Sequence, residues 1–252
     1  MNYYKLLQAI LDVAEEMLVC GAEVARVEDS INRMCDAYGC TRTNAFIMTS
    51  NIQVTTEAPD GEILTQIRRI VRNDTNFDRL DYLNDLSRYI CANKPDLNEL
   101  VAKYEEVMTR KPLPIWIEYA GAVLAASSFC IFFGGSWLDG LATAILAAII
   151  TVITRTLSKI EQNQLAKTFV TSLIAGFLAI VMVKIGIGAH TDKIMIGGIM
   201  LLIPGIALIN SVRDMLTGDL VSGLFRLLNA LLTAIVIAIG FALAIILTGG
   251  GA

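Results

Sequence analysis

The pattern of hydrophobic and polar residues divides this chain into two halves. Up to about residue 112, apolar residues recur at helical or alternating spacing among many charged residues, as in a soluble folded domain. After residue 113, apolar runs dominate, and five of them approach the length of a membrane span. We therefore expect an α+β domain over residues 1–112 and a transmembrane domain over residues 113–252.

The first half predicts two helices before and two helices after a small sheet along the chain. Gly21 and Gly39 each follow a run with apolar residues on one helical face, and both are expected to end a helix. Two β-like runs and the turn at Pro59-Asp60-Gly61 predict antiparallel strands. The expected helices are at about 4–20, 24–38, 77–91 and 96–109, and the expected strands at about 45–50, 52–57 and 62–71.

The second half predicts five transmembrane helices, so the fold class is an α-helical membrane protein preceded by a small cytoplasmic α+β domain. Lys and Arg gather before the first span, between the second and third, and between the fourth and fifth. Because positive loops stay in the cytoplasm, we expect a cytoplasmic amino terminus and an outside carboxyl terminus. The expected spans are about 115–133, 138–154, 168–187, 194–209 and 227–247.

The fourth apolar run is short and is interrupted. Residues 194–209 would make a helix of ~24 Å, against a hydrocarbon core of ~30 Å. Pro204 removes a backbone donor and Gly205 loosens the turn, so we expect a broken helix there. Polar residues follow the break directly, an arrangement that transport sites often use.

Composition and charge narrow the range of possible functions. The chain is 55% hydrophobic, and its first half holds 13 Lys and Arg against 18 Asp and Glu. A mildly acidic soluble half disfavours nucleic acid as a partner. Five cysteines without a CxxC pair are expected to be reduced core thiols. Since the single histidine is His190, we predict no catalytic residues, no metal site and no cofactor.

Three motifs resemble those of the threonine/serine exporter family. The first is GAEVARVEDSINRMCDAYG from Gly21, the second is FFGGSWLDG from Phe132, and the third is PGxxxxNxxxDxxxGDxxxGxxR from Pro204. They occur in order through both halves of the chain. The resemblance is closest to the larger, separately encoded subunit of a two-component exporter. It implies a multi-pass protein of the bacterial plasma membrane that exports a small metabolite with a short multispan partner subunit.

Several polar and helix-breaking residues are candidates for the transport pathway. Structural alternatives remain open: Asp139 and Asp219 as helix caps, Arg226 reaching the interface, and Glu118 solvated near a span end. Arg26 and Glu28 are candidates for cytoplasmic gating, or they form an ordinary solvated helix face. The pathway candidates are Glu118, Asp139, Pro204, Gly205, Asn210, Arg213, Asp214, Asp219, Arg226 and Asn229.

An arginine can hold a carboxylate through two parallel hydrogen bonds, which suits threonine/serine-like amino acids and succinate-like dicarboxylates equally. An odd span number without a visible internal repeat predicts a partner, either the short subunit or a second copy of this chain in a homo-oligomer, in contact with membrane lipid. The alternative functions are a membrane-tethered ligand sensor or scaffold and, less favoured, a membrane hydrolase.

Overall fold

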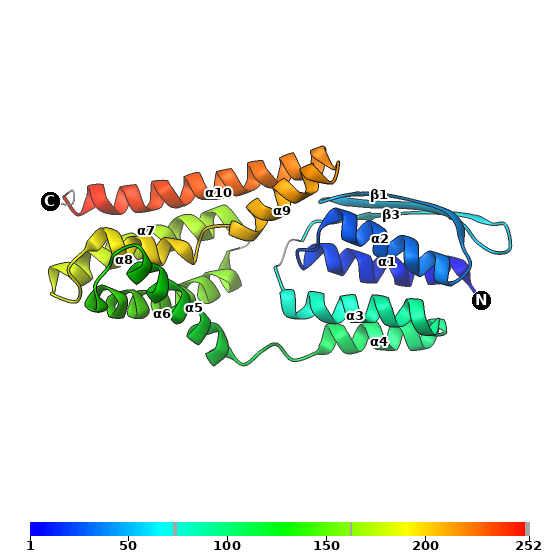
Figure 1. Cartoon of the computed structure of the whole chain (residues 1–252), viewed down its shortest axis with the longest axis horizontal. Helices are drawn as coiled ribbons and strands as arrows, with labels where there is room; N and C mark the ends of the chain where they lie inside the picture. Colours follow the sequence, from blue (N-terminus) through cyan, green and yellow to red (C-terminus); the bar gives the residue numbers. More distant parts are fainter. Residues whose placement is uncertain (73–74, 162, 250–252) are drawn as a thin grey trace. The chain divides into compact units, whose positions relative to one another are not determined.

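The structure, a computed structural model, describes residues 1–72, 75–161 and 163–249. They form two compact units, whose elements are labelled in Figure 1. The first unit contains Met1–Pro112 and also Leu208–Leu227. The second contains Leu113–Ala207 and the described residues from Leu228 onward.

The amino-terminal part of the first unit has the element types and order that the sequence predicts. The first strand, however, begins four residues earlier than expected. A β-bulge between Thr41 and Asn44 interrupts the alternation there, so these residues do not show the pattern of a strand. The elements are α1 (Tyr3–Val19), α2 (Val24–Ala37), β1 (Thr41–Met48), β2 (Asn51–Glu57), β3 (Ile63–Arg69), α3 (Phe77–Asn93) and α4 (Leu97–Thr109).

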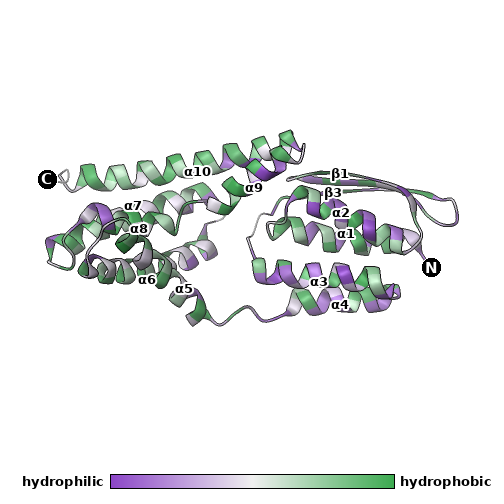
Figure 2. Ribbon diagram, in the orientation of Figure 1, coloured by the Kyte–Doolittle hydropathy of each residue, from purple (hydrophilic) through white to green (hydrophobic). Residues whose placement is uncertain are grey.

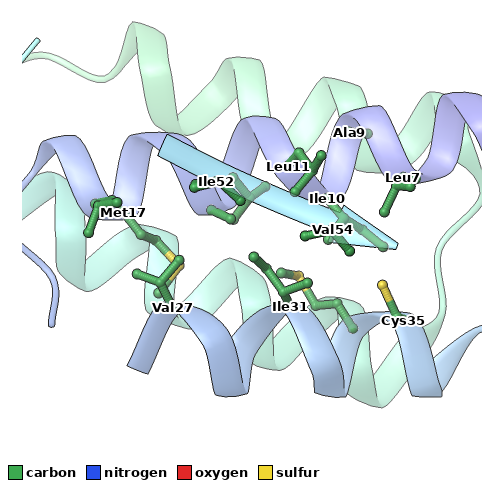
Figure 3. Close-up of a cluster of buried hydrophobic side chains, with 14 of the residues drawn as sticks. Leu7, Ala9, Ile10, Leu11, Met17, Val27, Ile31, Cys35, Ile52 and Val54 are labelled. Carbon is green, nitrogen blue, oxygen red and sulfur yellow. The ribbon is translucent and has the colours of Figure 1, made fainter. Parts of the chain in front are cut away.

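The three strands form one antiparallel sheet in the order β1-β2-β3. Its inner face packs against α1 and α2, and α3 and α4 form a further layer on the other side of that helix pair (Figure 1). Leu11, Ile31 and Ile52 are fully buried where helices and sheet meet (Figure 3). Apolar side chains removed from water on both sides of α1 stabilise this layered arrangement.

The buried carboxylate of Glu16 holds the segment that follows β3 in place. Glu16 on α1 is 1% exposed and accepts from Arg79 at 2.7 Å and from Arg72 at 3.0 Å. The Asn76 N–H, beside the start of α3, donates to the Cys20 carbonyl at 3.2 Å. These contacts hold the end of α1, from which the loop of the candidate site departs.

The second half of the chain is helical throughout its described elements. Four helices, α5, α6, α7 and α10, are long and apolar enough to cross a membrane, and Figure 2 shows α10 as hydrophobic along most of its length. The elements are α5 (Ile115–Phe132), α6 (Trp137–Ile160), α7 (Gln164–Lys184), α8 (Thr191–Met200), α9 (Gly205–Leu216) and α10 (Leu220–Leu247).

The predicted break at Pro204 is confirmed. Helix α8 ends at Met200, α9 begins at Gly205, and the two are bent by 54°. The pair is a fifth candidate span if it crosses as one broken helix. The chain is therefore a mostly helical membrane protein with four or five candidate spans and a small sheet.

Small residues allow the helices of the second unit to approach closely. A Cβ built on Gly197 of α8 would lie 2.7 Å from the Ala126 carbonyl of α5 and 2.5 Å from the Thr143 methyl of α6. Glycine here lets three helices meet closely, a common feature where the apolar solvent gives no drive for helix association. Leu146 and Ile194 are fully buried beside this contact.

Candidate functional site

The loop between α1 and α2 presents backbone acceptors and a carboxylate. Gly21 has a φ of +101°, a left-handed conformation that suits glycine and ends α1. Glu23 precedes α2 as its N-cap residue, but its side chain makes no capping hydrogen bond. The carboxylate is thus available to a partner elsewhere.

That partner comes from the end of the broken helix pair. Arg213 on α9 donates to Glu23 Oε1 at 2.6 Å. Asn210, one turn earlier, donates from Nδ2 to the Gly21 carbonyl at 3.3 Å, and Arg226 on α10 donates to the Ala22 carbonyl at 2.9 Å. We call Glu23, Asn210, Arg213, Asp214 and Arg226 the arginine cluster; all five lie in the first unit.

Asp214 is the most buried member of the arginine cluster. Its side chain is 1% exposed, and Oδ2 lies 3.2 Å from Nε of Arg226. Neither carboxylate oxygen accepts a hydrogen bond of good geometry within the described residues. The Val24 N–H at the start of α2 lies beside this carboxylate, where the helix dipole favours negative charge.

The turn between α9 and α10 carries two more buried oxygens without a hydrogen-bond partner in the described chain, Asp219 Oδ2 and Ser222 Oγ. Asp219 Oδ1 accepts from the Ser222 N–H at 3.2 Å, and the Asp219 N–H donates to the Asp214 carbonyl at 2.9 Å. Asp219 therefore caps α10, the structural alternative left open above, while its second oxygen faces the interior.

Of the two gating candidates, only Arg26 reaches the arginine cluster. Its guanidinium lies 3.8 Å from Glu23 Oε1, so Glu23 lies between Arg26 and Arg213. Glu28 is exposed on α2, and within the described residues no ion pair is assigned to it. Gating by either residue remains a prediction.

The remaining candidates belong to the second unit. Glu118 on α5 forms an ion pair with Arg155 on α6. Asn229 is exposed on α10. Pro204 and Gly205 form the break between α8 and α9.

Asp139 holds two loops together. Ser136 is the N-cap of α6 and Asp139, at the third helical position, completes its capping box. The other carboxylate oxygen, Oδ1, accepts from the N–H groups of Ala189 at 2.6 Å and His190 at 2.9 Å. With His190 Nδ1 2.8 Å from Oδ2, the fully buried Asp139 joins the loop before α6 to the loop before α8.

Sequence reasoning missed Glu23, Arg155 and His190 as the partners of predicted residues. Glu23 and Arg213 are 190 positions apart, so no local spacing links them. The sequence did place Glu23 inside the first family motif and directly before the predicted second helix. Within the described residues, no group of three or more His, Cys, Asp and Glu side chains could hold a metal ion.

Long apolar helices, one of them broken, and a polar cluster at the end of that break define a helical membrane protein of the transporter class. The model of a family described as "Putative threonine/serine exporter" matches residues 8–248. The chain belongs to this threonine/serine exporter family, and the resemblance drawn from its three motifs is confirmed. Membership of a transporter family, which is not an enzyme class, agrees with the expectation of no catalytic function.

Curated relatives fall into two groups. The chain is 27% identical over 241 residues to a "Probable threonine/serine exporter" of Mycobacterium tuberculosis, covering 94% of this chain and 45% of that protein. It is 24% identical over 232 residues to a "Threonine/serine exporter" of Corynebacterium glutamicum, covering 87% of this chain and 46% of the relative. The chain thus spans just under half of these two proteins.

The second group has the length of this chain. A "Probable succinate transporter subunit YjjP" of Klebsiella aerogenes is 26% identical over 236 residues, covering 92% of this chain and 90% of that protein. No solved structure matches the chain.

Proposed function

We propose that this chain is one subunit of an exporter of small carboxylate metabolites in the bacterial plasma membrane, and that Arg213 is its carboxylate contact. The observation that carries the proposal is the Arg213–Glu23 contact at 2.6 Å, in which this arginine already holds a carboxylate of the chain. A substrate carboxylate has the same charge and shape, so it can replace Glu23.

In this account Glu23 is a cytoplasmic gate. Its carboxylate occupies Arg213 while the loop at Gly21 and Ala22 is held by Asn210 and Arg226. Substrate binding releases Glu23 from Arg213 and frees the loop. The Arg213 side chain is 57% exposed, so exchanging one carboxylate for another costs little desolvation.

Asp214 is proposed as the site that couples export to a proton. A carboxylate that is 1% exposed and lacks a well-directed hydrogen bond gains from protonation, because burial disfavours the charged form. Arg226 at 3.2 Å favours the charged form. Arg226 also donates to the Ala22 carbonyl, so a movement of the loop that draws Arg226 away from Asp214 would favour protonation of Asp214.

The proposal also includes a domain division and a topology. Residues 1–112 form a cytoplasmic domain, residues 113–252 contain five spans, and the carboxyl terminus lies outside. The 54° bent pair supplies the fifth span. The relative named as a transporter subunit matches this chain in length, whereas the relative named as a threonine/serine exporter is about twice as long, which supports a separate membrane partner.

The concentration dependence of efflux tests the Arg213 assignment. Vesicles carrying this chain and its partner would be loaded with threonine, serine or succinate. Glu23→Gln removes the competing charge and should lower the KM for export, while Arg213→Lys keeps the charge, loses the planar fork and should raise it. Loss of a charge-assisted contact of ~1.5–3 kcal/mol corresponds to about ten- to hundredfold in affinity.

Glu62→Gln, at an exposed turn of the same unit, is the matched control and should leave the KM unchanged. An unchanged KM in Arg213→Lys would remove Arg213 from the substrate site and make Arg226 the next candidate.

A further inference from the structure

A cavity of about 520 Å³ lies between α2 and α3 in the first unit, and none of its lining residues belongs to the arginine cluster. Its volume is in the range of small-molecule sites, about 300–1,000 Å³. Polar and charged side chains form most of its wall. They include Arg26, Asp29, Ser30 and Arg33 from α2, and Arg88 and Cys91 from α3.

The charge of this cavity suits an anion. Three arginines line it against a single carboxylate, that of Asp29. Arg33 uses Nε to hold Asp29 at 2.8 Å, and Arg88 pairs with Asp85 on its own helix. A guanidinium has five N–H donors, so each of these arginines retains donors for a ligand.

The ion pairs that these arginines already make would compete only weakly with a ligand for the guanidinium groups. The side chains of Arg33 and Arg88 are 71% and 67% exposed, and exposed pairs typically contribute about 0–1 kcal/mol each. The guanidinium of Arg26 lies 3.8 Å from Glu23 Oε1, which is beyond hydrogen-bonding distance. A ligand with two or three anionic groups could bind several of these guanidinium groups at once, which no side chain of the cavity does.

We propose that the cavity between α2 and α3 binds a small multivalent anion, a polycarboxylate or a phosphate compound, and that Arg26 transmits its presence to Glu23. Glu23 is shared between Arg26 and Arg213. When the anion holds Arg26, Glu23 is left to Arg213 alone, and the gate closes more firmly. This regulatory effect rests on the function proposed above, whereas the binding site itself does not.

Cys91 provides a reporter of binding that is independent of transport. It lies in the cavity wall and is partly exposed, while the other four cysteines are buried. Burial raises the pKa of the Cys91 thiol, and the nearby Arg33 guanidinium opposes that rise. An anion seated among the arginines would both cover the thiol and weaken this stabilisation of the thiolate.

The experiment is maleimide labelling of Cys91 in the purified full chain at pH 8, with Cys91→Ser to assign the signal. Citrate and inorganic pyrophosphate are compared with chloride at equal ionic strength, so the two arms separate carboxylate from phosphate recognition. We expect saturable slowing of at least fivefold by one of them. Arg33→Gln and Arg88→Gln should each raise the half-maximal concentration at least tenfold.

Arg42→Gln is the matched control, because Arg42 is an exposed, ion-paired arginine on β1 outside the cavity. Equal labelling rates in all three salts, or an Arg42→Gln effect equal to that of Arg33→Gln, would overturn the binding site. The regulatory link is measured by efflux: the protecting anion on the cytoplasmic side should raise the KM in the wild type and not in Arg26→Gln. Protection of Cys91 without that difference would disprove the link through Arg26, and failure of export would leave the labelling result unaffected.

Discussion

The two ion pairs of the arginine cluster differ in how much water reaches them. The Arg226 and Asp214 side chains are 14% and 1% exposed, whereas those of Arg213 and Glu23 are 57% and 16% exposed. Removing one partner of a buried pair typically costs about 3–5 kcal/mol, and an exposed pair contributes about 0–1 kcal/mol. Arg226 is therefore suited to holding α10 against the loop, and Arg213 to exchanging its partner.

At the same scale, the cysteines report on how well the first unit is packed. Burial, with smaller contributions from Cys40 and Asp36, raises the pKa of Cys35 from 9.0 to about 12. Because the folded pKa lies above the unfolded value, this group stabilises the fold fully below pH 9, and the contribution is lost as the pH rises towards 12. At pH 8 the folded protein should hold ~1,000-fold less Cys35 thiolate than the unfolded chain.

Maleimide labelling followed by peptide mass spectrometry measures this difference. In the native protein Cys91 should label first and Cys35 should stay unmodified until denaturant is added. Native labelling of Cys35 at the rate of Cys91 would show that α2 does not pack as described.

At the scale of elements, the contact of α8 with α5 and α6 requires a glycine, which has no side chain, at position 197. An added methyl at Gly197 would meet the Ala126 carbonyl at 2.7 Å, and a backbone atom cannot rotate away. Overpacking of this kind typically costs about 1–3 kcal/mol. Gly197→Ala should therefore lower the melting temperature of the protein in detergent and reduce export.

Gly121 on α5 is the matched control, since a Cβ there meets no atom within 4 Å. Gly121→Ala should keep or raise the melting temperature, because alanine favours a helix by about 0.5–1 kcal/mol over glycine. Equal melting temperatures for the two variants would mean that α8 does not approach α5 closely.

The elements were largely predictable because each depends on local spacing. Helices α1 to α4 lie within two residues of their expected ends, and the break before Gly205 follows from proline chemistry at one position. The bulge in β1 was not predictable, because it breaks the alternation that identifies a strand. The sequence also marked Asp139 and Asp219, but its spacing left both capping and transport open.

At the scale of the whole molecule, the pairings could not be predicted. Glu23 meets Arg213 across 190 positions, and Asp139 meets His190 across 51. Local periodicity carries no information about such contacts, whereas the family motifs did mark Asp214 and Arg226.

The orientation of the chain is a further prediction at this scale. Trp137 and Ser158 are exposed near opposite ends of α6. The Lys and Arg residues of the loops predict that the end of α6 near Ser158 lies in the cytoplasm. In intact cells, a membrane-impermeant maleimide should label Trp137→Cys but not Ser158→Cys, while permeabilised cells should label both. The reverse result would invert the proposed topology.

The central claim is that Arg213 binds the exported carboxylate and that Glu23 only occupies it in the closed state. The double variant Glu23→Gln/Arg213→Gln neutralises both side chains of this pair, so that neither is left charged without the other. Its melting temperature should stay close to that of the wild type, since Arg213, with 57% of its side chain exposed, keeps much of its contact with water in the pair.

The most direct measurement is efflux of threonine, serine or succinate from vesicles that carry this double variant with its partner subunit, compared with Glu23→Gln alone. The account predicts that Glu23→Gln exports with a lowered KM, while the double variant loses export or needs at least about tenfold more substrate. Export by the double variant with the KM of Glu23→Gln would contradict the account, because it would show that Arg213 serves only as the partner of Glu23.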